Sequence, residues 1–246
     1  MLQIKGISKQ YKTGDLVQIA LNRVSLNFRD SEFVSILGPS GSGKTTIVNL
    51  LLRFYDINSG QITIDGIDIS KISKKDLRSA ISIVLQDPVL FGDTIENNIR
   101  YGRSDATDEE IDQALEFANC MEFVKHLPEG KKTILTEGAT NISQGQRQLL
   151  TIARAVIANP KILILDEATS SVDTRTEKHI QDAMTKLMAD RTSIIIAHRL
   201  STIQDADLIV VLDGGVVVEM GNHEELIAID GVYNRLYQTQ FKGLET

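Results

Sequence analysis

A glycine-rich octapeptide constrains the fold of this 246-residue chain more than any other stretch. Residues 38–45, Gly-Pro-Ser-Gly-Ser-Gly-Lys-Thr, match the pattern G-x-x-x-x-G-K-[ST]. An apolar run, residues 33–37, precedes them as a short buried strand, and apolar residues recur at helical spacing from Ile47 to Phe54. Strand, glycine loop and helix N-terminus together surround an anion with backbone N–H groups. The sequence therefore predicts a phosphate-binding loop, and this context disfavours the alternative of a chance glycine-rich turn.

The loop residues have distinct predicted roles. Lys44 is expected to reach the β and γ phosphates of a nucleoside triphosphate, and Thr45 to hold Mg²⁺. Glycine lets the backbone approach the phosphates closely. We expect the rest of the cradle to consist of Gly38, Ser40, Gly41, Ser42, Gly43 and Thr46.

Composition excludes several classes of protein. The net charge is −7 and the basic residues form no dense block, which argues against nucleic acid as a partner. The single cysteine, Cys120, excludes an internal disulfide and is expected to be a small buried residue. No apolar run approaches the ~18 residues that span a bilayer, and the N-terminus lacks a signal-peptide core. We expect a soluble chain whose membrane role, if any, comes through a partner or an attached domain.

The order of elements predicts an α/β fold. Alternation near the N-terminus and an Asp-Gly hairpin at 61–66 indicate antiparallel strands. Helical periodicity then continues to about residue 158, with capping boxes at 107–110 and 143–146. Strands and helices alternate again afterwards. We predict one domain, with an α/β core and antiparallel β-subdomain at 1–86 and 159–246, and an inserted α-helical subdomain at 87–158.

Two carboxylates follow the apolar strand at 162–165. Ligands bind beyond the carboxyl ends of strands in open parallel sheets, so both acids are expected beside the phosphates. Asp166 suits the Mg²⁺ shell, and Glu167 suits polarising an attacking water. The alternative is a solvated acidic strand end.

Four further positions remain open from the residues alone. His198 follows a strand and is placed to contact a γ-phosphate, or is structural. Gln86 is a candidate Mg²⁺ and water ligand, or an ordinary loop residue. Tyr11 falls in a polar segment, Lys9 to Gly14, between two expected strands. It is a candidate stacking partner for a purine base, or a partly buried tyrosine at a strand edge. Residues 143–146 are a second anion-binding helix terminus, or merely a helix cap.

Together these motifs resemble the nucleotide-binding domain of ABC (ATP-binding cassette) ATPases. Residues 142–146, Ile-Ser-Gln-Gly-Gln, look like the family signature LSGGQ, with isoleucine for leucine and glutamine for the first glycine. The resemblance covers nearly the whole chain and implies a RecA-like core sheet. The family's other motifs follow in order at Gln86, 166–167, 170–173 and His198, and Tyr11 matches its adenine-stacking position.

Several segments resemble the exporter branch of this family in particular. They are residues 53–56, 86–91, 97–99 and 197–202. Glu137 falls at that branch's additional contact loop with the membrane domain, although Ala139 and Thr140 depart from the usual glycine-rich sequence of that loop.

The first forty or so residues resemble a different branch, the free-standing cassettes of lipoprotein-release and macrolide-efflux complexes. Two hypotheses follow. Either two branches are joined near the phosphate loop in an engineered chimera, or the chain is a divergent natural exporter cassette. A single natural chain matching both halves would contradict the join.

The resemblance implies an Mg²⁺-dependent ATPase that dimerises head to tail, as a homo- or heterodimer, around two ATP molecules. Each ATP would lie between the phosphate loop of one cassette and Ser143, Gly145 and Gln146 of the other, with Asp173 also at the nucleotide site. The implied partner is an exporter's transmembrane domain, which would hold the cassette on the cytoplasmic side of a membrane. The alternatives are a nucleotide-gated dimerisation module with little turnover, an engineered cassette without a transport role, and an ABC ATPase of DNA repair or translation. The last class carries long insertions or tandem cassettes that do not fit in 246 residues.

Overall fold

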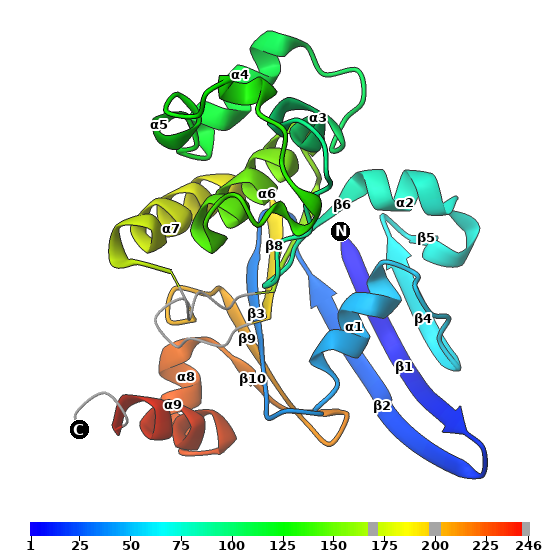
Figure 1. The fold of residues 1–246 in the computed structure, drawn as a ribbon. Helices are drawn as coiled ribbons and strands as arrows, with labels where there is room; N and C mark the ends of the chain where they lie inside the picture. The colour runs from blue at the N-terminus through cyan, green and yellow to red at the C-terminus, as the bar shows by residue number, and fades with distance from the viewer. Residues whose placement is uncertain (167–171, 197–202, 243–246) are drawn as a thin grey trace. The chain divides into compact units, whose positions relative to one another are not determined.

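A computed structural model describes residues 1–166, 172–196 and 203–242 (Figure 1). The chain divides into two compact units, which are described separately. The first unit comprises residues 1–81 and 192–246, and the second comprises residues 82–191.

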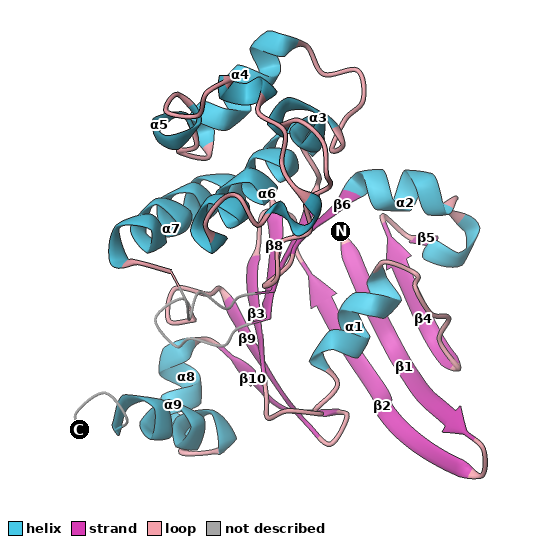
Figure 2. Cartoon of the chain, in the orientation of Figure 1, coloured by secondary structure: helices cyan, strands magenta, loops and turns pink. Residues whose placement is uncertain are grey.

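An antiparallel sheet with the strand order β2-β1-β4-β5 forms the N-terminal part of the first unit (Figure 2). The strands are β1 (Leu2–Thr13), β2 (Leu16–Phe28), β4 (Ser59–Ile64) and β5 (Ile67–Asp68). Apolar side chains alternate inward along β1 and β2, as at Leu2 and Ile4. Because β1 continues to Thr13, Tyr11 lies inside a strand and not in the polar connection that its surroundings suggested.

The predicted Asp-Gly hairpin is present. Asp65 and Gly66 have φ angles of 50° and 78° and connect β4 to β5. Two consecutive residues with positive φ are typical of the turns that suit the twist of antiparallel strands.

A parallel sheet forms the rest of the core of the first unit. Its central strand β3 (Phe33–Leu37) pairs in parallel with β8 (Thr192–Ile196) on one side and β9 (Leu208–Asp213) on the other. β10 (Val216–Gly221) pairs antiparallel with β9. The parallel strands are almost continuously buried, as expected where both faces of a sheet are covered.

The remaining elements of the first unit are short helices. They are α1 (Lys44–Leu51), η1 (Ile69–Lys71), α2 (Lys74–Ala80), α8 (His223–Ile229) and α9 (Val232–Lys242). At the C-terminal end, the Glu219 carboxylate accepts hydrogen bonds from the backbone N–H groups of Val232 and Tyr233, and so fixes the start of α9 on β10. Tyr233 is fully buried, and its hydroxyl oxygen lies 2.6 Å from His223 Nδ1. Burial raises the pKa of Tyr233 to about 12.

The second unit is mainly helical. Its elements are β6 (Ile81–Val84), α3 (Ile95–Arg100), α4 (Asp108–Phe117), α5 (Met121–Val124), η2 (Gly130–Lys132), η3 (Glu137–Ala139), α6 (Gln144–Ala158), β7 (Ile162–Asp166) and α7 (Thr174–Met188). Both predicted capping boxes are present, at Thr107–Glu110 before α4 and at Ser143–Gln146 before α6. Cys120 is buried, as expected, and burial raises the pKa of its thiol.

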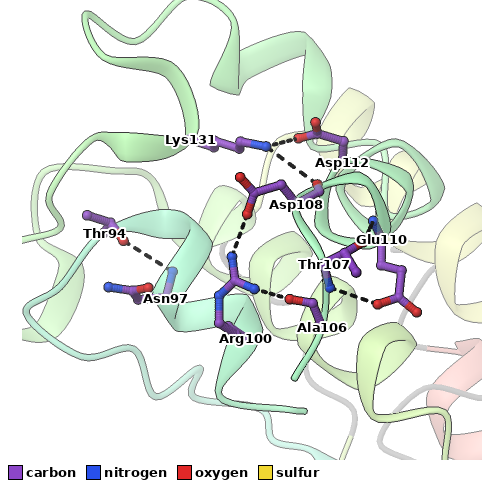
Figure 3. A network of polar contacts seen from close by, with 9 residues as sticks. All are labelled: Thr94, Asn97, Arg100, Ala106, Thr107, Asp108, Glu110, Asp112 and Lys131. Carbon is purple, nitrogen blue, oxygen red and sulfur yellow. Dashed lines mark hydrogen bonds and ion pairs between the residues drawn. The ribbon is translucent and has the colours of Figure 1, made fainter. Parts of the chain in front are cut away.

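A polar network joins α3, α4 and η2 (Figure 3). Arg100 donates to the Asp108 carboxylate at 2.7 Å and to the Ala106 carbonyl. Lys131 donates to Asp112 at 2.7 Å. The hydrogen bond from Arg100, followed by the charge of Lys131, holds the pKa of Asp108 below its usual value. These bonds tie the connection between α3 and α4 to the later η2 segment.

The predicted fold class is confirmed: parallel strands, a separate antiparallel sheet and a helical segment occur in the expected order. The predicted insert at 87–158 lies within the second unit, which also contains β6, β7 and α7. Its boundaries at 86 and 159 stay a prediction. Across the described helices, none combines the length and apolar character needed to cross a bilayer.

Candidate functional site

The glycine loop between β3 and α1 depends on backbone conformations that only glycine adopts easily. Gly38, Gly41 and Gly43 have φ angles of 151°, 79° and 107°. A Cβ on Gly38 would collide with the Leu212 carbonyl oxygen, and one on Gly43 would lie 2.7 Å from the Ala20 carbonyl oxygen. The loop therefore keeps its shape because neighbouring backbone packs directly against it.

The loop opens into a cavity of about 460 Å³ within the first unit. Its lining comprises Gly38, residues 40–46, Tyr11, Gln18, Ala20 and Ile196. Every loop residue predicted to cradle phosphate thus lines one cavity, together with Tyr11. The structure brings these predicted residues together from β1, the glycine loop and the first turn of α1.

Lys44 supplies the positive charge of this cavity. Its side chain is nearly buried, and Nζ donates to the carbonyl oxygens of Gly38 at 2.6 Å and Pro39 at 2.9 Å. Gly43 is the N-cap of α1, and it provides no side chain to cap the helix. A lysine ammonium and a helix N-terminus that no side chain caps are suited to an anion of high charge, such as a phosphate chain.

Tyr11 is held by two neighbours where it lines the cavity. Its ring meets the Tyr55 ring edge-on, with centroids 5.5 Å apart. Lys9 Nζ lies 5.2 Å from the Tyr11 centroid and donates to the Asp56 carbonyl at 2.6 Å. The ring is therefore fixed before any ligand arrives, which lowers the entropy cost of stacking on it.

The signature-like segment lies at the start of α6 in the second unit. Ser143 Oγ accepts from the Gln146 N–H at 3.2 Å, and Gln146 Oε1 accepts from the Ser143 N–H at 2.9 Å. A Cβ on Gly145 would collide with Thr176 Cγ2 and lie 2.8 Å from Val172 Cγ1. Gly145 therefore permits close packing of α6 against the start of α7.

Asp173 is the N-cap of α7. Its Oδ1 accepts from the Thr176 N–H at 3.0 Å, and this backbone hydrogen bond lowers the pKa of the Asp173 carboxyl. The structure thus places Asp173 near Gly145 through Thr176, in the same unit.

The remaining candidates are partly described. Gln86 is exposed, two residues after β6, and Asp166 is the half-buried last residue of the neighbouring strand β7. Glu167 and His198 lie outside the described residues. Within residues 1–166, 172–196 and 203–242, no three His, Cys, Asp or Glu side chains gather as a metal site. Mg²⁺ held largely by phosphate oxygens needs no such cluster, and Thr45 faces the phosphate cavity.

An exposed apolar cluster follows Gln86 in the second unit. Val89, Phe91 and Tyr101 are 55%, 43% and 70% exposed, and the two rings lie 4.8 Å apart. Arg154 of α6 holds this segment by donating to the Val89 carbonyl at 2.8 Å and to Asn98.

The sequence did not single out Gln18 as a site residue. Its position in the cavity depends on the pairing of β1 with β2, which local sequence does not show. The signal available was the alternation along β2, which places Gln18 on the same face as Ala20.

Comparison with known proteins agrees with this arrangement. The family model for the ABC transporter family matches residues 21–170, more than half of the chain. This chain belongs to the ABC transporter family. The expected family resemblance is therefore confirmed.

The relatives of this ABC transporter domain include exporters. It is 49% identical over 241 residues to an uncharacterised ABC transporter ATP-binding protein, YfiC, of Bacillus subtilis, covering 98% of this chain and 39% of that one. It is 48% identical over 241 residues to an ATP-dependent lipid A-core flippase of Syntrophus aciditrophicus, again 98% of this chain and 39% of the relative. A fatty acid ABC transporter ATP-binding/permease protein of Mycobacterium tuberculosis is 55% identical over 213 residues, 87% of this chain and 34% of the relative.

A solved structure of a bacterial Atm1-family ABC exporter with ATP bound has the same fold, with a TM-score of 0.90 and 43% identity. The match covers 97% of this chain and 41% of the exporter chain. The chain therefore spans well under half of the length of the relatives it matches. The exporter-type assignment is confirmed.

The hypothesis of a join between two branches receives no support. The Bacillus subtilis relative matches 98% of the chain as one natural sequence, on both sides of the phosphate loop. The other hypothesis, a divergent natural exporter cassette, agrees with this match.

Proposed function

We propose that this domain binds Mg²⁺-ATP and hydrolyses it to drive an ABC exporter. The observation that carries this proposal is the cavity that joins the glycine loop, Lys44 and Tyr11 in one unit. A triphosphate fits the loop and an aromatic base fits the ring. The relatives, an ATP-dependent flippase and an ATP-binding/permease protein among them, support the same function.

Binding would begin with an exchange of partners at Lys44. Its ammonium now contacts the Gly38 and Pro39 carbonyls, and phosphate oxygens would replace them with charge-assisted hydrogen bonds. The N-terminus of α1 would add its dipole and N–H groups. Mg²⁺, held by Thr45, Gln86 and Asp166, would neutralise charge on the phosphates.

Hydrolysis would then require an activated water. Glu167 would polarise a water molecule for attack on the γ-phosphorus, and His198 would donate a hydrogen bond to a γ-phosphate oxygen. The water oxygen would form the new P–O bond as Glu167 accepts a proton from it, the bond from the γ-phosphorus to the β-phosphate oxygen would break, and ADP and inorganic phosphate would leave. These two assignments rest on sequence position.

The working unit would be a head-to-tail dimer of cassettes. The partner cassette would supply Ser143, Gly145 and Gln146 to the γ-phosphate, with Asp173 close by. ATP would close the dimer because the γ-phosphate gives this helix terminus a charged partner, and hydrolysis would release it. The partner would be a second copy of this domain or a related cassette.

Coupling to a transmembrane domain would use the second unit. The exposed cluster of Val89, Phe91 and Tyr101 is suited to apolar side chains of such a domain, with Glu137 as a further contact. The domain would then work on the cytoplasmic side of a membrane, held there by that partner or by a fused segment.

The first test is the ATPase rate as a function of protein concentration. A quadratic rise at low concentration is expected if the dimer is the active unit.

Glu167→Gln should retain ATP binding, nearly abolish phosphate release and stabilise an ATP-dependent dimer. A Glu167→Gln variant that hydrolyses ATP at close to the wild-type rate would contradict the role of Glu167. ATP-dependent dimerisation without phosphate release in the wild type would instead indicate a nucleotide-gated dimerisation module.

A further inference from the structure

Gln18 lies directly opposite Tyr11 in the antiparallel sheet. The register pairs Tyr11 of β1 with Gln18 of β2. Side chains of directly opposed residues project from the same face, with Cβ atoms about 5 Å apart. Both side chains line the phosphate-loop cavity, as does Ala20, two residues further along the same face.

The amide of Gln18 is available to a ligand. It makes no side-chain hydrogen bond within the part of the chain that the structure describes, and the residue is exposed. Its neighbour Tyr11 is held by Tyr55 and Lys9, so the position of a stacked base is limited on one side. A base on this ring would lie within reach of the Gln18 amide.

We infer that Gln18 recognises the edge of the base and selects adenine over guanine, an inference that rests on the proposed nucleotide binding. A carboxamide offers one acceptor and one donor. Adenine presents the matching N6 amino donor and N7 acceptor, and glutamine forms a bidentate pair with these two atoms. Guanine presents two acceptors, O6 and N7, on the same edge. The amide then makes one hydrogen bond and sets its oxygen against a second acceptor.

This role is distinct from that of Tyr11. Every base has a π face, so stacking on tyrosine is tolerant of sequence and chemistry. Discrimination between purines requires hydrogen bonds to the base edge, and Gln18 is a polar side chain that lines the cavity directly opposite the ring in the sheet. Tyr11 would therefore supply affinity, and Gln18 would supply specificity.

The test is isothermal titration of the chain with ATP and with GTP, in EDTA to prevent turnover. The wild type is expected to prefer ATP, and Gln18→Ala to reduce that preference by about fivefold or more, the low end for a bidentate pair. Gln18→Arg should shift the preference towards GTP, because arginine pairs with guanine O6 and N7. 7-Deaza-ATP, which lacks the N7 acceptor, should bind the wild type more weakly than ATP but bind Gln18→Ala as well as ATP does.

Gln10→Ala is the matched control. Gln10 precedes Tyr11 on β1 and faces the opposite side of the strand, so its removal should leave the ATP-to-GTP ratio unchanged. Equal affinity of the wild type for ATP and GTP, or an unchanged ratio in Gln18→Ala, would overturn the inference while leaving nucleotide binding intact. Absence of binding by both nucleotides would instead refute the proposed function itself.

Discussion

Two helix N-termini in this chain resemble each other in composition but differ in whether a side chain caps them. α1 begins after Gly43, in a left-handed conformation, and receives no side-chain cap. α6 begins after Ser143, whose hydroxyl caps the Gln146 N–H while Gln146 caps the Ser143 N–H. Both sequences are rich in serine and glycine, yet only the first leaves its helix end uncapped by side chains.

The difference shows how each end can meet an anion. At α1, the glycines shape the backbone into a cradle, and Lys44 provides the charge. At α6, the capping box pairs the Gln146 N–H with the Ser143 hydroxyl oxygen, and the hydroxyl hydrogen of Ser143 can still donate to a phosphate. The first end would therefore hold an anion through backbone N–H groups and a lysine ammonium, whereas the second end would offer a neutral hydroxyl. This difference agrees with the proposal that the loop holds the nucleotide and that α6 of a partner contacts only its γ-phosphate.

The largest expected effect comes from removing the positive charge of Lys44 at the N-terminus of α1. Lys44→Ala should weaken ATP binding by at least about tenfold, because each hydrogen bond to a charged group contributes about 1.5–3 kcal/mol. Calorimetric titration measures this loss. Arg147→Ala is the matched control at α6, where the guanidinium donates to the Gly138 carbonyl. If Lys44→Ala binds ATP normally, the phosphate-loop assignment fails.

The next prediction concerns the packing of α6 against the start of α7 at Gly145. Gly145→Ala would force a methyl group against Thr176 and Val172, and overpacking of this kind costs about 1–3 kcal/mol of unfolding free energy. Denaturant unfolding followed by circular dichroism measures it. Thr176→Ser removes the methyl group that the new Cβ would meet, so it should recover part of the loss in the double variant. Equal stability of Gly145→Ala and wild type would contradict the close approach.

A smaller effect is expected from removing the cap itself. Ser143→Ala should lower the unfolding free energy by about 1 kcal/mol, the usual value for a helix N-cap. Thermal unfolding of the wild type and of Thr107→Ala provides the comparison, because Thr107 makes the same capping box at α4 in the same unit. A loss at Thr107 without any loss at Ser143 would mean that the α6 cap is not formed in solution.

The smallest effect is electrostatic and concerns the helix that packs under Gly145. The Thr176 N–H lowers the pKa of the Asp173 carboxyl, so this cap stabilises the fold above the unfolded value near 3.8 and its contribution is lost as pH falls through the lower folded value. Thermal unfolding between pH 5 and about 3 should fall slightly more steeply for the wild type than for Asp173→Asn, which caps without titrating. Parallel curves would exclude the contribution.

Local spacing predicted much of the fold. The capping boxes at Thr107 and Ser143 involve residues three apart, so their partners are visible in the sequence, and both formed as expected. The Asp65-Gly66 hairpin likewise needs only two adjacent residues with positive φ. Helix α7 spans Thr174–Met188, in the part of the chain where strands and helices were expected to alternate again.

Pairing between distant segments was harder to predict. Tyr11 was placed in a polar connection because Lys9 to Gly14 contains few apolar residues, but hydrogen bonding to β2 carries the strand through to Thr13. Phe54 continued the helical spacing of α1, yet the helix ends at Leu51 and Phe54 is 55% exposed. In both cases tertiary contacts outweighed the local pattern.

The sequence by itself determined where the glycine loop lies, between β3 and α1, because a short apolar run, closely spaced glycines and a helical periodicity are local signals. Only the tertiary structure decided what faces that loop: the register of β1 against β2 brought Tyr11 and Gln18 to one cavity, and the approach of Thr176 required glycine at 145. The physical reason is how far apart in the sequence the interacting residues lie. Backbone conformation and helix caps depend on neighbours a few residues away, whereas a strand register and a packed helix pair depend on residues that meet only when the chain has folded.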